Sequence, residues 1–398
     1  MVEETIYLDN AATTRVRKEV LDAMLPYFIE DFGNPDSIHA MGKPGRDAVK
    51  EARAKIAHVI NAKPEEVYLT SGGSESDNWA IKSAVLGPHA KGKHVIVSSI
   101  EHHAIINTCE YLEKMGIDVT YLPVDQYGLV DPKDVEAAIR PDTAIISVMT
   151  ANNEIGTIEP IREIGEVARK HKVLLHTDAV QAYGQIDIDV VRDNIDFLSA
   201  SAHKLGGPKG IGFLYIRNGI RLDPLIHGGE QERGIRGGTT NVPGAVGFGK
   251  AAEFAEADMK ERAEKETRFR DHLIHRVLTE IPYSRLNGHP TRRLPSNANF
   301  SFDFIEGEGM LMSMNMNGIC VSTGSACASG SLDPSHVLLA IGLEHQTAHG
   351  SLRFSIPDYV TMEQIDRAVD VLKASIARLR SLSPLYDDFI KGQKATEA

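Results

Sequence analysis

The sequence predicts an α/β fold built on one doubly wound, mainly parallel sheet, followed by a smaller α+β unit. Between about residues 66 and 216, short runs rich in Val, Ile and Leu alternate with helical patterns. Continuous apolar runs of this kind are typical of strands buried on both faces, with the intervening helices as crossovers. The expected strands are Val67–Thr70, His94–Ser98, Val119–Leu122, Ala144–Met149, Val173–His176, Phe197–Ser199 and Gly212–Ile216.

The second unit follows a long polar helix, expected over about Ala245–Glu280. Ala298–Phe304 and Ser351–Ile356 have the pattern of half-buried strands. Thr361 and Gln364 form a capping box, which predicts the start of a helix. The apolar residues that follow keep helical spacing; they are Ile365, Val369, Leu372, Ile376 and Leu379.

Composition excludes several classes of protein. The 398 residues are 42% hydrophobic and 25% charged, which is typical of a globular chain with a well-buried core. A net charge of −12 disfavours nucleic acid as the primary partner. The N-terminus lacks a signal-peptide pattern, and no apolar run approaches the ~20 residues that cross a bilayer. We therefore expect a cytoplasmic protein that does not enter a membrane.

The chain has three cysteines, Cys109, Cys320 and Cys327, and no C-x-x-C motif. An odd number in a long chain argues against a disulfide framework, and the spacing argues against a zinc site. A reducing compartment is the simpler interpretation.

A Gly- and Ser-rich turn follows the expected strand Val67–Thr70. It reads Thr70-Ser71-Gly72-Gly73-Ser74-Glu75 and precedes a helix expected over about Glu75–Val85. Glycines let the backbone approach a ligand closely, and free N–H groups at a helix start favour phosphate. Such turns are common before helices, so this turn alone is a weak indication of a phosphate site.

Polar residues follow two other buried strands, at the edge where ligands of α/β sheets bind. Asp178 lies at the carboxyl end of the strand Val173–His176, and a carboxylate there can pair with a protonated pyridine nitrogen. Glu101-His102-His103 follows the strand His94–Ser98, and either imidazole can stack on a flat ring or move protons near neutral pH. Taken singly, Asp178 is more often a helix N-cap, and such a histidine is more often structural.

Lys204 leaves the strand Phe197–Ser199 among small residues, in Ser201-Ala202-His203-Lys204. Partial burial lowers the pKa of an amine, which suits formation of a Schiff base with an aldehyde. The alternative is a surface lysine in a Gly-rich turn. Lys209 is a rival, but its place after Pro208 indicates a turn. Together these features predict a site for a phosphorylated aromatic cofactor.

The motifs resemble, in order, those of the cysteine desulfurases of the NifS/IscS group, which are fold-type I pyridoxal-phosphate enzymes of the class V aminotransferase family. The resemblance covers about residues 6–387 and is carried by YLDNAATT, SGGSESDN, EHHAIINTC, NNEIG, HTDAVQ, SAHKLGGPKG, RGIRGGT and STGSACASGSLDPS. It implies a large pyridoxal-phosphate-binding domain over 16–259 and a small domain formed by 1–15 and 260–398. The small domain would carry a mobile catalytic-cysteine loop at about 322–334.

The resemblance also implies roles for individual residues. Lys204 would be the Schiff-base lysine, His102 the ring-stacking and proton-transferring histidine, and Asp178 the partner of the pyridine nitrogen. The other implied cofactor contacts are Gln181 to the ring hydroxyl, Gly73, Ser74, Ser201 and His203 to the phosphate, and Thr239 to the phosphate from the other subunit of a homodimer. Asn153 and Arg353 would fix the substrate, L-cysteine. Gly73-Ser74 departs from the family's frequent Ala-Thr but keeps a small residue and a hydroxyl.

Cys327 is the expected sulfur acceptor. Cys109 falls in a helical pattern and Cys320 in a strand-like run, so both are expected to be core residues. Cys327 lies in a stretch without apolar periodicity, which indicates a loop. In the family, the loop thiolate attacks the substrate's sulfur, and the products are alanine and a persulfide. No intrinsic metal is expected, although Cys327 could touch a nascent iron–sulfur cluster.

Family members supply sulfur for iron–sulfur cluster assembly or tRNA thiolation, so an iron–sulfur scaffold or another sulfur acceptor is the implied partner. A selenocysteine lyase or another class V enzyme stays open as an alternative. A docking platform with vestigial catalysis is a third possibility, against which the complete set of Lys204, His102, Asp178 and Cys327 argues.

Overall fold

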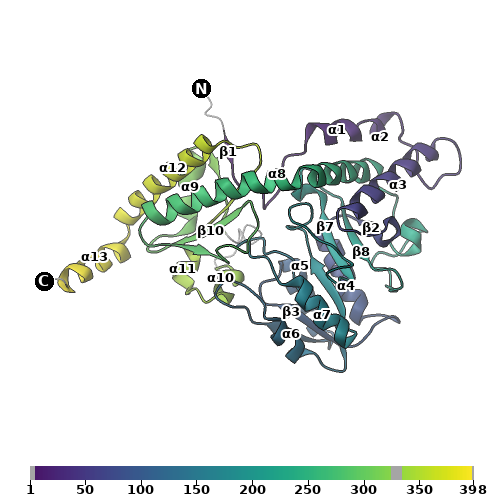
Figure 1. The fold of residues 1–398 in the computed structure, drawn as a ribbon, viewed down its shortest axis with the longest axis horizontal. Helices are drawn as coiled ribbons and strands as arrows, with labels where there is room; N and C mark the ends of the chain where they lie inside the picture. The colour runs from purple at the N-terminus through teal and green to yellow at the C-terminus, as the bar shows by residue number, and fades with distance from the viewer. Residues whose placement is uncertain (1–4, 324–333, 397–398) are drawn as a thin grey trace.

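The structure, a computed structural model, describes residues 5–323 and 334–396. Figure 1 shows a larger body around one sheet and a smaller body that holds the C-terminal helices, with the long helix α8 (Val242–Glu280) running across both. Cys327 lies outside the described residues.

Within the described residues, the large sheet has seven strands in the order β2-β8-β7-β6-β5-β3-β4. β8 pairs antiparallel with β2 and β7, and the other neighbours are parallel. The prediction of a mainly parallel, seven-stranded sheet is therefore confirmed. The strands are β2 (Val67–Thr70), β3 (His94–Ser98), β4 (Asp118–Leu122), β5 (Thr143–Ser147), β6 (Leu174–Asp178), β7 (Phe197–Ser201) and β8 (Gly212–Ile216).

Apolar side chains cover both faces of this sheet. Every residue of β3, β5, β7 and β8 is buried, as the continuous apolar runs predict. Successive residues alternate between two hydrophobic clusters: Ile146 and Leu198 pack with α1, α3, α7 and α8, whereas Ile145 and Phe197 pack with α4 and α5. The helices are α1 (Lys18–Met24), α2 (Pro26–Ile29), α3 (Gly42–His58), α4 (Gly73–Val85), α5 (His103–Glu113), α6 (Pro132–Ala138) and α7 (Ile161–His171), with short 3-10 turns at Pro64–Glu66, Ala202–Lys204 and Gln231–Gly234.

The smaller body has its own hydrophobic cluster, in which Phe300 and Leu352 of its sheet pack against Phe269 of α8 and Leu372 of α12. The capping box of Thr361 and Gln364 is present at the start of α12. The predicted boundaries at 15/16 and 259/260 stay a prediction. The elements are a three-stranded sheet of β9 (Ser284–Asn287), β10 (Asn297–Phe302) and β12 (Ser351–Ser355), the parallel pair β1 (Ile6–Tyr7) and β11 (Ile319–Cys320), and the helices α9 (Gly307–Met316), α10 (His336–Ala340), α11 (His345–His349), α12 (Met362–Ser381) and α13 (Pro384–Thr396).

Residues 9–17, here called the N-terminal strap, connect the two bodies. At its start Asp9 forms a β-bridge with Ser355. At its other end Arg17 N–H donates to the carbonyl of Gly206, which follows β7. The strap thus crosses the carboxyl edge of the large sheet. Among the described residues, no helix combines the length and apolar character that a bilayer crossing requires.

Candidate active site

A cavity of about 330 Å³ lies at the carboxyl edge of the large sheet, beyond the last residues of β6 and β7. Parallel strands place their carboxyl ends at one edge, so residues far apart in sequence meet there. Most of the predicted site residues line this cavity: Gly73, Ser74, His102, Asn153, Asp178, Gln181, Ser201, His203, Lys204 and Arg353.

Lys204 reaches this cavity from the 3-10 turn that follows β7. Its Nζ donates hydrogen bonds to the carbonyl oxygens of Ala11 (2.5 Å) and Ala12 (2.9 Å) in the N-terminal strap. Gln181 Nε2 also donates to the Ala11 carbonyl, at 2.9 Å. The rival Lys209 is exposed and does not line the cavity. The geometry therefore favours Lys204 as the lysine that can reach a ligand.

Asp178 is the last residue of β6, and its Oδ1 accepts the Val180 N–H at 2.8 Å. Burial raises its pKa to about 6, while the Val180 N–H and the Lys204 ammonium oppose that rise. Asp77 of α4 also lines the cavity, and burial together with the Asp178 charge holds its pKa well above the usual range. Near neutral pH, the negative charge of this pair therefore lies on Asp178.

His102 is the N-cap of α5, and its Nδ1 accepts the Ala104 N–H at 3.1 Å. Burial, together with the nearby Lys204 and His103 charges, lowers its pKa to about 4. The imidazole is therefore neutral at physiological pH, with its proton assigned to Nε2 by the hydrogen bond at Nδ1. A neutral ring can stack on an aromatic ligand without placing a second cation beside Lys204.

The opposite wall holds the start of α4, a helix of 13 residues that begins at Gly73. Gly72 has φ of +157°, and a Cβ at Gly73 would lie 2.6 Å from Val180 Cγ2. The absence of side chains therefore brings the N-terminal N–H groups of α4 to the cavity surface. His203 completes this wall, with Nδ1 3.1 Å from the Thr13 hydroxyl.

Arg353 of β12 enters the cavity from the smaller body and is 2% exposed. Its Nη1 donates to the Asn153 carbonyl and its Nη2 to Asp9 Oδ1, both at 2.9 Å. Its Nε is buried and has no hydrogen-bond partner within the described residues. A buried guanidinium with a donor left over suits a carboxylate ligand.

Two predicted residues do not join this cavity. Thr239 is exposed, in the coil between the turn Gln231–Gly234 and α8. Cys327 lies outside the described residues. Cys109 is a core residue as expected, and burial raises the pKa of its thiol to about 12. Cys320 was expected to be buried but is half-buried, because β11 is a two-residue strand with β1 as its partner.

His103, the alternative to His102, also lines the cavity. Several other lining residues were not predicted: Ala11, Ala12, Asp77, Glu101, Met149, Glu154, Val180 and His336. Asp77 lies within a helical pattern, where an acidic residue is normally expected on the solvent-exposed face of the helix. Glu101 and Glu154 lie inside the motifs EHHAIINTC and NNEIG, so those motifs carried a signal that was not used.

The cavity fits pyridoxal phosphate by the chemistry of its residues. One wall offers a helix start whose glycines leave the N–H groups open, as a phosphate requires. The floor offers the Asp178 carboxylate and the neutral His102 ring, and Lys204 supplies an amine for an aldehyde.

The chain matches the family Aminotransferase class-V over residues 6–368 and belongs to that family, in its cysteine desulfurase group. Cysteine desulfurase IscS of Methanosarcina thermophila is 54% identical over 382 residues, which are 96% of this chain and 94% of that protein. A solved NifS-like protein superposes with a TM-score of 0.88 at 36% identity, covering 94% of this chain and all of the other. A structure of SspA in complex with cysteine has a TM-score of 0.80 at 40% identity, covering 90% and 100%.

Proposed function

We propose that this protein is a cysteine desulfurase that converts L-cysteine to L-alanine and passes the sulfur to Cys327. The observation that carries the proposal is the meeting of Lys204, Asp178 and His102 in one cavity, in a chain closely similar to IscS proteins. The reaction balances in atoms and electrons without an external oxidant. L-cysteine and the Cys327 thiol give L-alanine and a Cys327 persulfide. The C–S bond is replaced by a C–H bond, and the two electrons gained by that carbon are lost by the two sulfurs.

Pyridoxal phosphate would supply, when bound, an electron sink for the carbon that loses its proton. Lys204 would hold its aldehyde carbon, and the Asp178 carboxylate would keep its ring nitrogen protonated. His102 would stack on the ring, and Gln181 would donate to the ring hydroxyl. Gly73, Ser74, Ser201 and His203 would bind the phosphate.

The substrate carboxylate binds Arg353, whose buried Nε lacks a partner among the described groups. Asn153 lies beside it, with its carbonyl already accepting from Arg353 Nη1. The Lys204 amine would remove the proton from the substrate Cα. The Cys327 thiolate then attacks the substrate sulfur, with His102 as the proton donor or acceptor.

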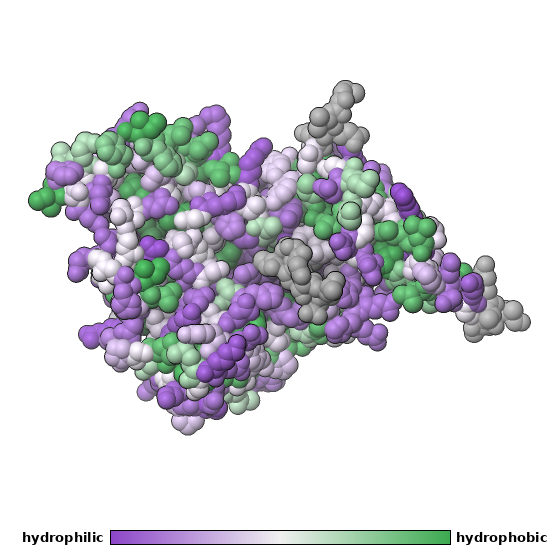
Figure 2. Space-filling view, turned by 180° about the vertical axis from the view of Figure 1, so that it is seen from behind, coloured by the Kyte–Doolittle hydropathy of each residue, from purple (hydrophilic) through white to green (hydrophobic). Residues whose placement is uncertain are grey.

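A homodimer completes the site in this proposal. Thr239 is exposed and outside the cavity of its own chain, as a residue given to a partner subunit would be. α1, α2 and the loop after them expose large apolar side chains, and Figure 2 shows apolar residues gathered at this corner of the molecule. The exposed fractions reach 57% at Phe28, 78% at Ile29, 67% at Phe32 and 100% at Ile38. Contiguous exposed apolar surface marks an interaction site, here a second copy of the chain.

The persulfide is then passed to a sulfur acceptor, for which an iron–sulfur scaffold protein is the proposed partner. The cytoplasmic location stays a prediction.

Replacing Cys327 with Ala tests the assigned function. The variant should keep the visible absorbance of bound pyridoxal phosphate but lose formation of alanine and sulfide from L-cysteine, because the sulfur has no acceptor. Cys320→Ala is the matched control, and it should keep both the cofactor absorbance and the formation of alanine and sulfide. Normal turnover in Cys327→Ala would refute the role of this thiol.

A further inference from the structure

Glu154 stands out among the lining residues because its carboxyl group is buried and is hydrogen-bonded to a serine of another segment of the described chain. Its Oε2 accepts a hydrogen bond from the Ser335 hydroxyl at 2.5 Å. Burial raises the pKa of Glu154 to about 7, and Ser335 and Arg353 oppose that rise. Burying a carboxyl at this cost is expected only where its contacts are specific.

The backbone of Glu154 is held on two sides. The Asn152 side chain accepts the N–H groups of Glu154 (2.8 Å) and Ile155 (3.0 Å), which fixes the turn. From the smaller body, Asn299 Nδ2 donates to the Glu154 carbonyl at 3.1 Å. The carboxyl group is therefore a fixed point in the cavity wall.

The Ser335 hydroxyl group both donates and accepts hydrogen bonds. Its Oγ accepts the N–H groups of Val337 (3.2 Å) and Leu338 (3.3 Å) as the N-cap of α10. Because both N–H groups donate to Oγ, the hydroxyl proton is left for Glu154. The next residue, His336, lies 3.0 Å through Nε2 from the Glu101 carbonyl and stacks edge-on against His103, with 4.8 Å between ring centroids.

Ser335 is the eighth residue after Cys327 in the sequence, and Ser322 is the fifth before it. Ser322 is also held at the cavity, because its backbone exchanges hydrogen bonds with that of Arg353 (3.2 and 2.6 Å). The segment that carries Cys327 is therefore joined at its two ends to described residues, Ser322 at Arg353 and Ser335 at Glu154.

We propose that Glu154 is a positioning residue for sulfur transfer, which acts by holding Ser335 and thereby the C-terminal anchor of the Cys327-bearing segment. The inference rests on the proposed function, because it takes Cys327 as the sulfur acceptor. It assigns Glu154 no contact with the substrate or the cofactor. Its effect should therefore appear in the transfer of sulfur and be absent from the binding of L-cysteine to the cofactor.

The test compares Glu154→Ala, Glu154→Gln and Ser335→Ala with the parent enzyme in single-turnover reactions. One readout is the change in cofactor absorbance when L-cysteine is added, and the other is the Cys327 persulfide, measured by mass spectrometry. Glu154→Ala and Ser335→Ala should keep the first rate and slow the second by about tenfold or more, the size expected when a buried polar group loses its hydrogen-bond partner. Glu154→Gln should restore most of the second rate, because its amide oxygen can accept the Ser335 proton.

Glu159→Ala is the matched control, since Glu159 is also a buried acid but accepts the Val130 N–H, away from Ser335. It should leave both rates unchanged in the folded enzyme. If Glu154→Ala and Glu154→Gln slow persulfide formation equally, or if neither slows it, the positioning role is overturned. Should Glu154→Ala not fold, Ser335→Ala carries the same comparison. Failure of the proposed function is distinguished by Cys327→Ala, which would then still release sulfide whatever stands at position 154.

Discussion

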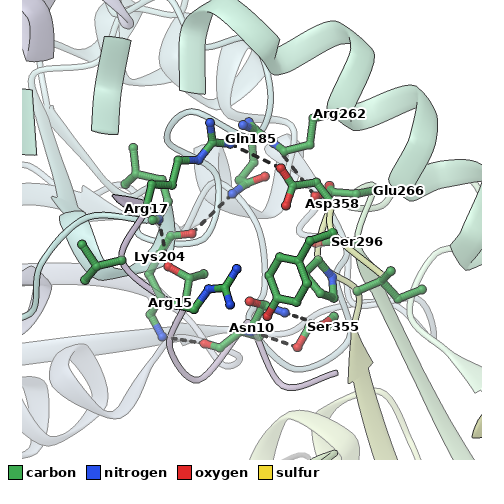
Figure 3. A pocket seen from close by; sticks show the side chains of 18 of the residues that line it. Asn10, Arg15, Arg17, Gln185, Lys204, Arg262, Glu266, Ser296, Ser355 and Asp358 are labelled. Atoms are coloured by element: carbon green, nitrogen blue, oxygen red, sulfur yellow. Dashed lines mark hydrogen bonds and ion pairs between the residues drawn. The ribbon is translucent and has the colours of Figure 1, made fainter. Parts of the chain in front are cut away.

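Replacing Glu266 with Gln should stabilise the protein, and the gain should grow with pH. Glu266 lies on α8, 4% exposed, beside a second cavity of about 680 Å³ on the far side of the N-terminal strap (Figure 3). Its Oε1 is 3.9 Å from Arg262 Nε, and its Oε2 has no hydrogen-bond partner in the described part of the chain. Burial raises its pKa from 4.5 to about 8, although Arg262 opposes the rise.

The direction of the change in stability with pH follows from proton binding. Because the pKa in the folded protein is above that of the unfolded chain, the folded state keeps a proton that the unfolded chain loses, and stability falls as pH rises from about 4.5 through 8. Each pKa unit between the two states is worth ~1.4 kcal/mol. The loss is then about 1 kcal/mol at pH 5 and roughly 3 kcal/mol at pH 7. Gln has nearly the same shape and does not titrate, so the advantage of the variant should grow by about 2 kcal/mol between these pH values.

Urea unfolding of the cofactor-loaded enzyme at pH 5, 7 and 8 measures this difference. Glu264→Gln is the control, because Glu264 is exposed on the same helix; its curve should follow that of the parent protein. Parallel pH dependences for Glu266→Gln and the parent would refute the reasoning, since they would mean that Glu266 titrates alike in the folded and unfolded states.

Two further outcomes are expected. Lys204→Ala should remove the visible absorbance of lysine-bound pyridoxal phosphate, whereas Lys209→Ala, at an exposed site outside the cavity, should keep it; an unchanged spectrum in the first variant would point to another lysine. Ile29→Asp should shift the protein toward monomer in sedimentation analysis and weaken cofactor binding in parallel, because the partner's Thr239 would be withdrawn. Met316→Asp, at an 84% exposed position in the smaller body, should do neither; a dimer that survives Ile29→Asp would place the interface elsewhere.

The sheet could be predicted because its strands are buried on both faces and are therefore continuous apolar runs. The ends of those strands were harder to predict from the sequence. β6 and β7 each continue two residues beyond the predicted end, through Thr177–Asp178 and Ala200–Ser201. All four residues are small or polar, and two of them, Asp178 and Ser201, line the cavity. A criterion based on apolar residues therefore ends each strand too early where the site begins.

The ion-pair partners inside the site could not be predicted from the sequence. Arg353 was predicted to bind a carboxylate, but its ion pair with Asp9 joins residues at opposite ends of the chain. Periodicity carries no information about such a contact. The buried acid Asp77 was missed for the same reason, since burial of a carboxyl group depends on the tertiary arrangement around it. Glu154 differs, because its place in the motif NNEIG did mark it.

The N-terminal strap has a consequence for the order in which the protein can be completed during synthesis. Tyr7 is the strand partner of Cys320, and Asp9 forms an ion pair with Arg353. The Ala11 carbonyl accepts a hydrogen bond from the Lys204 amine. Tyr7 and Asp9 therefore find these partners only after Cys320 and Arg353 have been synthesised. Contacts of such large sequence separation are slow to form. The large sheet can assemble earlier, but its cavity lacks the wall that Ala11 and Ala12 provide until the N-terminal strap docks. The capacity to bind the cofactor tightly should therefore be acquired late during synthesis.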